Sequence, residues 1–393
     1  MKVKIENIGK VVTGKTPSTS NSANFGEGYS FITPADLHID DGVVKYTKRT
    51  ITQKGFNSIK NNTISGLSIL VGCIGWDMGN VALVNGKCAT NQQINSITDI
   101  NYELYNPYYI YYWLKLHKNF LFKLANVTRT PILKKSDFEN IEIEIPNIKV
   151  QNTTAGLLRT IDSKIANNNA ISKELESMAK TIYNYWFLQF EFPDKDGKPY
   201  KSNGGKMVWN EQLKQEIPEG WEVNTLKEIL KENIKSKVKV KEAAEIGKVP
   251  FFTSGEAILF VDKPIVSGLN CYLNTGGNAG IKWFYGDASY STDTWSLTCD
   301  SDMKYLLPFI LKGIEPSMDK KFFQGTGLKH LQKNLLRNYI ITIPDKNTID
   351  RFKKIVNNSF KQQSKLFNEN LQLKSMRDFL LPMLMNGQVT IDK

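Results

Sequence analysis

The second half of this 393-residue chain repeats its first half at a constant offset of 198 residues. Residues 143–146 (IEIP) return as residues 341–344 (ITIP), and the same offset relates Leu133, Lys135, Asn140, Leu175, Ser177 and Met178 to Leu331, Lys333, Asn338, Leu373, Ser375 and Met376. A period this long exceeds the roughly 20–50 residues of solenoid and propeller repeats, so each copy is expected to be a whole domain followed by a helix. Two similar modules on one chain are expected to bind a target that offers two successive sites, similar but not identical to each other.

Composition excludes several classes of protein. The hydrophobic fraction of 41% and the charged fraction of 23% are ordinary for a globular chain, and the length allows two or three domains. No apolar run approaches the roughly 18 residues of a membrane span, and the N-terminus lacks the apolar core of a signal peptide. We therefore expect a cytoplasmic protein that does not enter a membrane.

The cysteines and the net charge carry further information. Four cysteines without a C-x-x-C pair and three histidines are too few for a structural zinc site, so no metal is expected. Cys73 and Cys271 also lie 198 residues apart, which we interpret as one buried strand position used twice. The net charge of +12 favours a polyanionic partner, because each neutralised phosphate adds salt-dependent affinity. A merely lysine-rich surface explains the charge equally well, so both readings stay open.

The pattern along the chain predicts six segments. Short β-rich stretches punctuated by glycines predict a mixed α/β domain over residues 1–146, with a helix that begins at Asn106 and Pro107 and a half-buried final strand over residues 141–145. The remaining segments are a central long helix (147–192), a linker or exposed hairpin (193–216), a second domain of the same type (217–344), a C-terminal long helix (345–385) and a tail (386–393).

The two long helices are expected to pack on each other as an antiparallel coiled coil with pseudo-twofold symmetry, which makes the fold class α+β. Each helix carries apolar residues at spacings of three and four, and neither has enough apolar bulk to fold alone. Asn168 and Ser172 interrupt the first stripe, and a buried Asn there would fix the register. The residues predicted to form this interface are Leu158, Ile161, Ile165, Leu175, Ile182, Trp186, Phe352, Val356, Leu373 and Leu380.

Several short motifs resemble catalytic sites. Residues 9–16 (GKVVTGKT) match the phosphate-binding pattern G-x-x-x-x-G-K-[ST], but Pro17 and a polar run follow where a helix is required. We interpret Lys15 as a contact to nucleic-acid phosphate, with a nucleotide-binding protein as the alternative. Residues 106–109 (NPYY) lack the second proline of an amino-methyltransferase motif, and the letters of a nuclease site in residues 193–198 lie too close together to share a metal. No catalytic site is therefore expected.

Three parts of the sequence resemble the specificity subunits of type I restriction–modification systems. Residues 8–17 (IGKVVTGKTP) and 31–37 (FITPADL) are similar to the start of that family's first recognition domain. Residues 185–193 (YWFLQFEFP), 197–202 (GKPYKS) and 217–221 (IPEGW) are similar to its central helix and the beginning of its second domain, and residues 380–389 (LLPMLMNGQV) to its closing segment.

The resemblance implies a non-catalytic reader of double-stranded DNA. Each target-recognition domain would read one half of a bipartite site, and the helix pair would set the spacer and dock two methyltransferase subunits, with restriction or translocase subunits as further partners. It places S-adenosylmethionine, ATP and Mg²⁺ on those partners and no cofactor on this chain. The amino-acid sequences of the two domains differ between their matching first and last strands, so the two half-sites are expected to differ. A structural coiled-coil scaffold with incidental basic charge is the remaining alternative.

Base readout needs amide, hydroxyl, carboxylate or guanidinium groups on loops, and phosphate binding needs lysine or arginine. The candidates in the first domain are Lys15, Thr16, Ser18, Trp76, Asp77, Asn80, Asn91, Gln92, Gln93, Arg129 and Lys134. Those in the second are Ser254, Asn274, Asn278, Asp293, Thr294, Trp295, Gln324, Lys329 and His330. For Asn91 and Gln92 the alternative to DNA contact is that their side chains cap the loop. For Arg129 and Lys134 the alternative is that they simply face solvent. Core packing is favoured over stacking on bases for Trp76 and Trp295.

Overall fold

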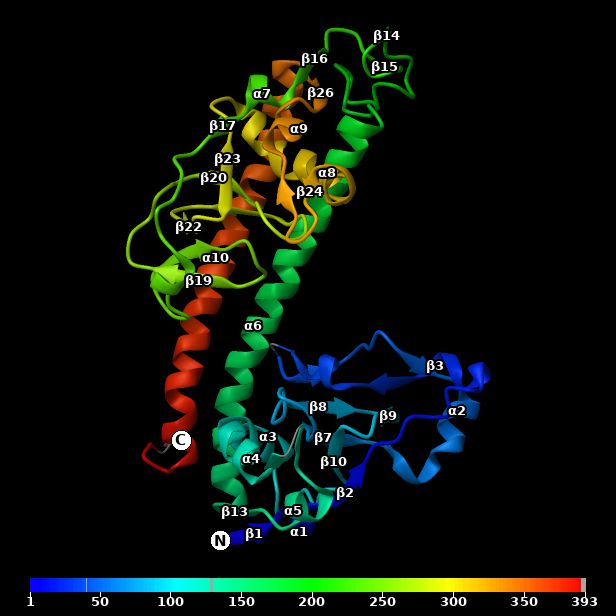
Figure 1. Ribbon diagram of the computed structural model, residues 1–393, viewed down its shortest axis with the longest axis vertical. Helices are drawn as coiled ribbons and strands as arrows, with labels where there is room; N and C mark the ends of the chain where they lie inside the picture. Colours follow the sequence, from blue (N-terminus) through cyan, green and yellow to red (C-terminus); the bar gives the residue numbers. More distant parts are fainter. Residues whose placement is uncertain (40, 128–129, 390–393) are drawn as a thin grey trace. The chain divides into compact units, whose positions relative to one another are not determined.

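The computed structural model describes residues 1–39, 41–127 and 130–389 (Figure 1). The chain divides into two compact units, unit 1 of Met1–Asn167 with Asn370–Lys393 and unit 2 of Asn168–Glu369. Each unit therefore contains one α/β module together with a part of each long helix. We call residues 1–146 the first module and residues 217–344 the second module.

The first module contains strands, short helices and 3₁₀ turns in the following order. They are β1 (Lys2–Lys4), α1 (Ile5–Ile8), β2 (Lys10–Thr13), η1 (Ser22–Asn24), β3 (Phe25–Ile32), η2 (Pro34–Leu37), β4 (Val43–Val44), β5 (Thr50–Ile51), α2 (Gln53–Ser58), η3 (Lys60–Asn62), β6 (Thr63–Ile64), β7 (Leu67–Gly72), β8 (Val81–Asn85), β9 (Cys88–Thr90), β10 (Ile94–Thr98), α3 (Pro107–Leu116), α4 (Lys118–Leu124), β11 (Asn126–Val127), β12 (Pro131–Ile132), α5 (Lys135–Glu139) and β13 (Glu142–Glu144). Asn106 caps α3 by accepting from the backbone N–H groups of Tyr108 and Tyr109, as expected.

Two sheets form the body of the first module. The central sheet has the order β2-β10-β7-β8-β4, and a second sheet has the order β5-β3-β9-β6. Strand β1 pairs with β13 at the junction to the long helix, and β11 pairs with β12 as a hairpin. Apolar side chains on one face of the central sheet pack under α3, whose tyrosines Tyr109, Tyr111 and Tyr112 are buried.

The second module repeats this layout. Its elements are β16 (Glu222–Thr225), α7 (Leu226–Ile229), β17 (Lys231–Glu232), η5 (Val240–Glu242), β18 (Val249–Phe252), β19 (Ile258–Val261), β20 (Leu269–Asn274), β21 (Ile281–Tyr285), β22 (Ser289–Tyr290), β23 (Thr294–Thr298), η6 (Asp302–Tyr305), α8 (Leu307–Lys321), β24 (Phe323–Gln324), β25 (His330–Leu331), α9 (Lys333–Arg337) and β26 (Ile340–Ile343). The order β17-β23-β20-β21 matches β2-β10-β7-β8, and the pairs β16–β26 and β24–β25 match β1–β13 and β11–β12. The expected duplication of a mixed α/β domain is confirmed.

The interpretation of Cys73 and Cys271 as one repeated strand position is wrong. Cys271 is the third residue of β20 and pairs with Leu297, and the residue with the matching pairing in the first module is Ile69, opposite Ile97. Cys73 follows the end of β7 instead. The offset is not constant through the module, because the loops between strands differ in length. Both thiols are nevertheless buried, and burial raises the pKa of Cys73 to about 12.

The two long helices begin where the modules end. Helix α6 runs over Ile148–Tyr183 and continues as a π-helical turn, η4 (Asn184–Leu188). It ends at Leu188 and not at residue 192, because Phe190 has a φ of 62°, a conformation that a helix cannot continue. Helix α10 covers Lys346–Met385. The segment expected to be a linker contains a turn and the hairpin of β14 (Met207–Asn210) and β15 (Gln215–Pro218).

Within unit 1, the last turns of α10 pack on the first half of α6. Leu381 and Leu384 lie in the same buried core as Ala155 and Leu158. Ile161 and Ile165 are also buried, whereas Leu380 is only half-buried against this core. The buried stripe of α10 therefore runs through Leu381 and Leu384. The expected Leu380 lies at the edge of this stripe, because the buried face is one residue further along the helix than the sequence pattern predicted.

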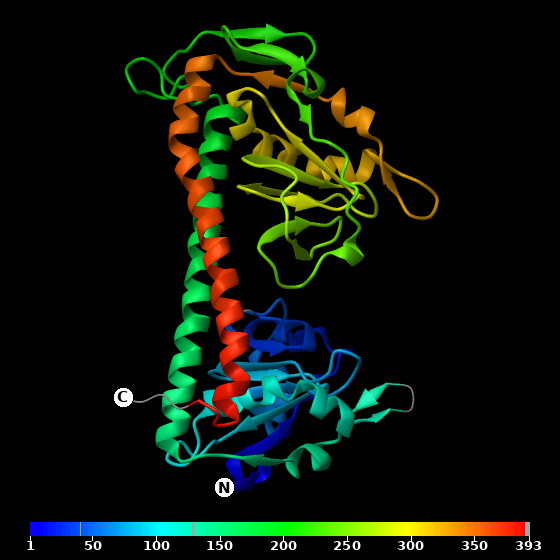
Figure 2. The ribbon, with the colours of Figure 1, turned by 90° about the vertical axis from the view of Figure 1, so that its left-hand side faces the viewer.

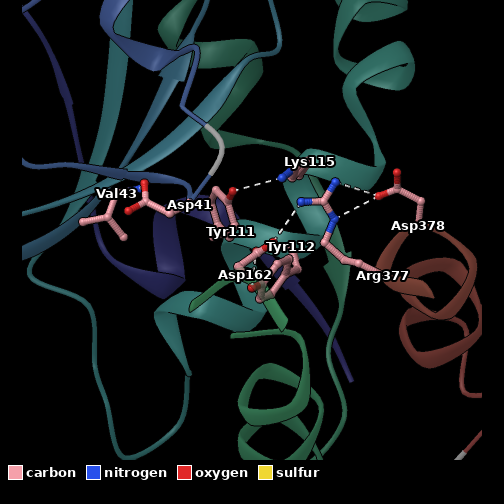
Figure 3. A network of polar contacts seen from close by, with 8 residues as sticks. All are labelled: Asp41, Val43, Tyr111, Tyr112, Lys115, Asp162, Arg377 and Asp378. Carbon is pink, nitrogen blue, oxygen red and sulfur yellow. Dashed lines mark hydrogen bonds and ion pairs between the residues drawn. The ribbon is translucent and has the colours of Figure 1, made fainter. Parts of the chain in front are cut away.

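A buried polar network joins the same two helices to α3 (Figure 3). Asp162 is 3% exposed and accepts hydrogen bonds from the Arg377 guanidinium at 2.9 Å and from the Tyr112 hydroxyl at 2.6 Å. Arg377 also bonds to Asp378 at 2.9 Å. Burial lowers the pKa of Arg377, but its bonds to these two carboxylates outweigh that effect and raise it above the usual value. Nothing in the sequence pattern predicted this network.

Within unit 2, the second half of α6 packs on the first half of α10. Trp186 of η4 and Phe352 of α10 are buried with their ring centroids 6.0 Å apart, and Val356 is fully buried in the same core. Asn168 is buried and donates to Glu369 at 3.0 Å. Of the other expected interface residues, Leu175 and Ile182 of this unit are half-buried, as is Leu373 of unit 1. Early α6 thus meets late α10 in unit 1 and late α6 meets early α10 in unit 2, so the helices run antiparallel as expected.

Candidate nucleic-acid interface

Three loops and a hairpin meet at one end of the central sheet of the first module. Strands β2 and β7 end where β10 begins, because β10 runs antiparallel to both. The Cys73 N–H donates to the Gln93 carbonyl at 2.7 Å, and the hairpin joins through an isolated bridge between Ile74 and Ile132. We call residues 14–21, 73–80 and 91–93 with the β11–β12 hairpin the first loop edge. This edge brings together the described candidates of the first domain from three separate segments of the sequence, except Lys134, which follows the hairpin.

Polar contacts hold the 73–80 loop in place. Asp77 forms a short contact with His38 and lies 3.9 Å from Lys118, and Lys118 donates to the Asn80 side chain at 2.6 Å. Burial raises the pKa of Asp77, but hydrogen bonds from Asn80 and His38 outweigh it and lower the pKa below its usual value. Asp77 and Asn80 are therefore occupied in shaping the loop.

Trp76 is the exposed residue of this loop. Its side chain is 72% exposed, and its ring centroid lies 6.1 Å from that of Phe122. Core packing, the favoured interpretation of Trp76 from the sequence, is wrong, because no element covers the loop that carries it. An exposed indole on a loop held by hydrogen bonds is available to a partner.

The other two loops of the first edge contact each other. The Thr16 hydroxyl donates to the Gln92 side chain at 2.9 Å. Asn91 caps its own loop, since its amide donates to Gln93 and its carbonyl oxygen accepts from the Gln93 backbone at 3.1 Å. Lys15, Ser18, Gln92 and Lys134 are exposed, and Arg129 lies outside the described residues.

The second module has a matching second loop edge. Residues 253–257, 275–280 and 291–293 meet at the equivalent end of its sheet together with the β24–β25 hairpin. The Thr275 N–H donates to the Asp293 carbonyl at 3.3 Å, and the Gly277 N–H donates to the Lys329 carbonyl at 2.9 Å. Ser254 donates to the same Asp293 carbonyl. Asn278, Asp293, Gln324, Lys329 and His330 are all exposed there.

Three of the second domain's candidates face inward. Trp295 is 4% exposed in the core, and its indole N–H donates to Glu232 at 3.1 Å. Thr294 is buried and its hydroxyl donates to the Phe252 carbonyl at 3.2 Å, and Asn274 is buried and donates to the Asn278 carbonyl at 3.3 Å. Strands β20 and β23 place these side chains inside the module, away from the surface where contact with DNA was predicted, and the burial of Trp295 agrees with core packing, its favoured interpretation.

The sequence reasoning missed residues that support the first edge and the core of the second module. His38 and Lys118 anchor the 73–80 loop, and in the second module Arg337 bonds to Glu232 at 2.7 Å, the carboxylate that also accepts from the Trp295 indole. Each lies more than 30 residues from its partner, so no local spacing pattern could have found it. Among the described residues, no group of three or more His, Cys, Asp and Glu side chains is arranged to hold a metal ion.

A family model described as the type I restriction modification DNA specificity domain matches residues 1–177 and 218–368. The chain belongs to this family. The specificity subunit of the type I restriction enzyme MjaIX from Methanocaldococcus jannaschii is 26% identical over 418 residues, which cover 99% of this specificity subunit and 93% of that protein. The specificity subunit of HindI from Haemophilus influenzae is 29% identical over 172 residues, covering 44% and 37% of the two chains.

A solved structure shows the same fold. The S subunit of a type I restriction–modification system from M. genitalium superposes with a TM-score of 0.61 at 18% identity, over 100% of this specificity subunit and 96% of that chain. Across residues 1–39, 41–127 and 130–389, no helix is long and apolar enough to cross a membrane.

The phosphate-loop alternative for residues 9–16 does not fit this specificity subunit. Lys10–Thr13 form strand β2, and no helix begins directly after Thr16, since residues 14–18 have no regular secondary structure. The backbone N–H groups there therefore form no helix N-terminus to receive a phosphate. Gly14 is required for packing instead, since a Cβ there would collide with Thr90 and Asn91. The nuclease-like letters of residues 193–198 also form a turn, in which the Asp194 carboxylate accepts hydrogen bonds from the backbone N–H groups of Asp196 and Lys198.

Proposed function

We propose that this specificity subunit reads a bipartite double-stranded DNA site, with one loop edge on each half-site. The observation that carries the proposal is that two modules of the same topology present loop edges with different exposed side chains. The first edge exposes Trp76 and Gln92, and the second exposes Asn278 and His330 at its own loops. A common framework with different readers suits two different half-sites. The chain is a specificity subunit and not a catalytic one.

The decisive experiment is a methylome. The chain is produced with its methylating partner in a host that lacks other methyltransferases, and methylated bases are mapped by single-molecule sequencing. We expect one bipartite motif with two different half-sites and a fixed spacer. Methylation without such a motif would overturn the proposal and would favour the structural scaffold.

The helix pair is also proposed to dock two methyltransferase subunits. Met178 on α6 and Met376 on α10 are related by the 198-residue repeat, and both are exposed, at 60% and 51%. Equivalent apolar side chains on two helices suit two copies of one partner. S-adenosylmethionine, ATP and Mg²⁺ belong on partner subunits in this assembly, which works on DNA in the cytoplasm and includes restriction or translocase subunits.

This docking predicts a change in stoichiometry. Either Met178→Glu or Met376→Glu is expected to lower the number of bound methyltransferase subunits from two to one, because a carboxylate would lose its hydration in an apolar contact. Native mass spectrometry of the complex measures the number. Val208→Glu, at a 45% exposed position of the β14–β15 hairpin, is the matched control and should keep two. Two bound subunits in both single variants would contradict the docking surface.

The helix pair is further proposed to set the spacer. Because Asn168 contacts Glu369, an insertion in α6 alone would misalign the helices, so the test needs matched insertions in both. Four residues placed after residue 167 and four after residue 369, where the compact units divide, lengthen each helix by about 6 Å. We expect a spacer longer by one to two steps of about 3.4 Å, with both half-sites unchanged.

The same methylome assay reads this result. Four residues inserted in the exposed turn at residues 195–198 provide the control and should leave the spacer as it is. An unchanged spacer in the double-insertion variant, with methylation retained, would rule out the helices as the ruler.

A further inference from the structure

In sequence, the hairpin of each loop edge lies within a segment that contains four lysines. Lys118 and Lys123 precede β11 and Lys134 and Lys135 follow β12, and no Asp or Glu occurs from the first to the last of these four lysines. The second module repeats the pattern around β24 and β25, again with four lysines and no acidic residue. These are Lys320, Lys321, Lys329 and Lys333. In a chain with 39 acidic residues, two such segments at equivalent positions indicate a shared electrostatic role.

The strands of both hairpins, β11 and β12 in cyan and β24 and β25 in orange, project from their modules, as Figure 2 shows. Lys123, Lys134, Lys320, Lys321 and Lys329 are exposed. Beside them lie exposed apolar side chains, Leu328 at 67% in the second module and Ile132 at 41% in the first. The lysines of such a projecting hairpin suit contacts with the phosphates of a nucleic acid, and its apolar side chains suit contacts with the sugars.

In each module the hairpin is bonded to one particular loop. The Leu133 N–H donates to the Cys73 carbonyl at 2.9 Å, and the Leu331 N–H donates to the Thr275 carbonyl at 3.0 Å. Isolated bridges join Ile74 to Ile132 and Gly276 to His330. The position of the hairpin therefore determines the position of the 73–80 loop with its exposed Trp76, and of the 275–280 loop with Asn278.

We propose that the β11–β12 and β24–β25 hairpins grip the DNA backbone through their flanking lysines and thereby place the bonded loops, 73–80 and 275–280, against the bases. The inference rests on the proposed DNA-reading function and assigns its parts. Lysines contribute affinity and register without sequence information, whereas the indole of Trp76 and the amide of Asn278 contribute discrimination.

The second module offers a charge-matched test of the grip. Lys320→Gln, Lys321→Gln and Lys329→Gln are combined in one variant, and Lys195→Gln, Lys198→Gln and Lys201→Gln, on an exposed turn of the same unit, form the control. Both triple variants lose three charges. Each variant is assembled with its methylating partner, and binding to a duplex that carries the methylome motif is measured by fluorescence anisotropy over a range of salt concentrations.

The expected result is a change in salt dependence. The slope of log K against log salt should become less steep by about 0.9 for each lost phosphate contact, hence by up to about 3 in the hairpin variant, and should stay near wild type in the control. The methylated sequence should remain the same in both variants. Equal slopes in the two triple variants would overturn the grip. Absence of specific binding by the wild-type complex would instead overturn the proposed function.

The first module tests the loop. Trp76→Ala is expected to weaken binding to the correct first half-site about tenfold while binding to a duplex with a scrambled first half-site stays unchanged. Trp209→Ala, on the β14–β15 hairpin and 54% exposed, is the matched control and should bind as wild type. Thermal melts of the two variants check that both fold. Equal affinities of the two variants for both duplexes would overturn the base-facing position of the 73–80 loop.

Discussion

Replacement of Arg377 by alanine is expected to destabilise unit 1 by about 3–5 kcal/mol, since it leaves a buried charge without its partner. Asp162 is 3% exposed, and after the substitution the Tyr112 hydroxyl would remain as its hydrogen-bond donor among the described residues. The end of α10 would then lose its polar attachment to α6 and α3. Urea denaturation followed by circular dichroism measures the change in the free energy of unfolding.

Two further variants make this prediction specific. Lys45→Ala breaks an ion pair of 2.7 Å with Asp41 in the same unit, but the lysine is 60% exposed, so a loss of only about 0–1 kcal/mol is expected. Combining Asp162→Leu, Arg377→Met and Tyr112→Phe removes the whole network and should restore most of the stability, because no buried polar group is then left unpaired. Equal losses for Arg377→Ala and Lys45→Ala would show that the network contributes little.

Replacement of Phe352 by alanine is expected to cost about 3–5 kcal/mol in unit 2. Its ring is fully buried, and the ring centroids of Phe187, Trp186 and Phe309 lie 4.9, 6.0 and 6.0 Å away. Removal of the ring leaves a cavity where α6, α8 and α10 meet, since the three neighbouring rings are held by their own elements. The same denaturation experiment measures the loss.

The control for this variant lies on the same helix. Phe379 is 66% exposed on α10, so Phe379→Ala removes the same atoms without opening a cavity and should change the free energy of unfolding by less than about 0.5 kcal/mol. A small effect of Phe352→Ala would mean that the aromatic core of unit 2 can collapse around the missing ring.

The ion pair between Asp162 and Arg377 is a point at which the repeat is chemically asymmetric. The 198-residue offset relates Asp162 to Phe360 and Arg377 to Ala179, and both of the latter are buried apolar residues of unit 2. The helices are therefore joined by an ion pair in unit 1 and by aromatic packing in unit 2. Exchange of equivalent helix segments would place a charged side chain opposite an apolar one, so the two halves are not interchangeable.

The candidate site could be predicted only in part. The loops were found because turn residues, amides and hydroxyls cluster between β-rich stretches, and the described loops indeed gather at one end of each sheet. The assignment within the loops failed for Trp76, because core packing was favoured for both tryptophans and only Trp295 is buried, whereas Trp76 is exposed. A tryptophan beside a strand suits both environments, and the outcome depends on whether another element covers it.

The sequence by itself determined the duplication, the order of the elements and the two long amphipathic helices. The 198-residue offset and the spacing of apolar residues are patterns along the chain, and they do not depend on which elements meet in space. Only the tertiary structure decided which residues of α10 form its buried stripe, that Asp162, Arg377 and Tyr112 form a network, and that His38 and Lys118 support the loop of Trp76. These contacts join residues from 38 to 215 positions apart. Burial and pairing at such separations are set by which elements meet in space, and no periodicity along the chain encodes that meeting.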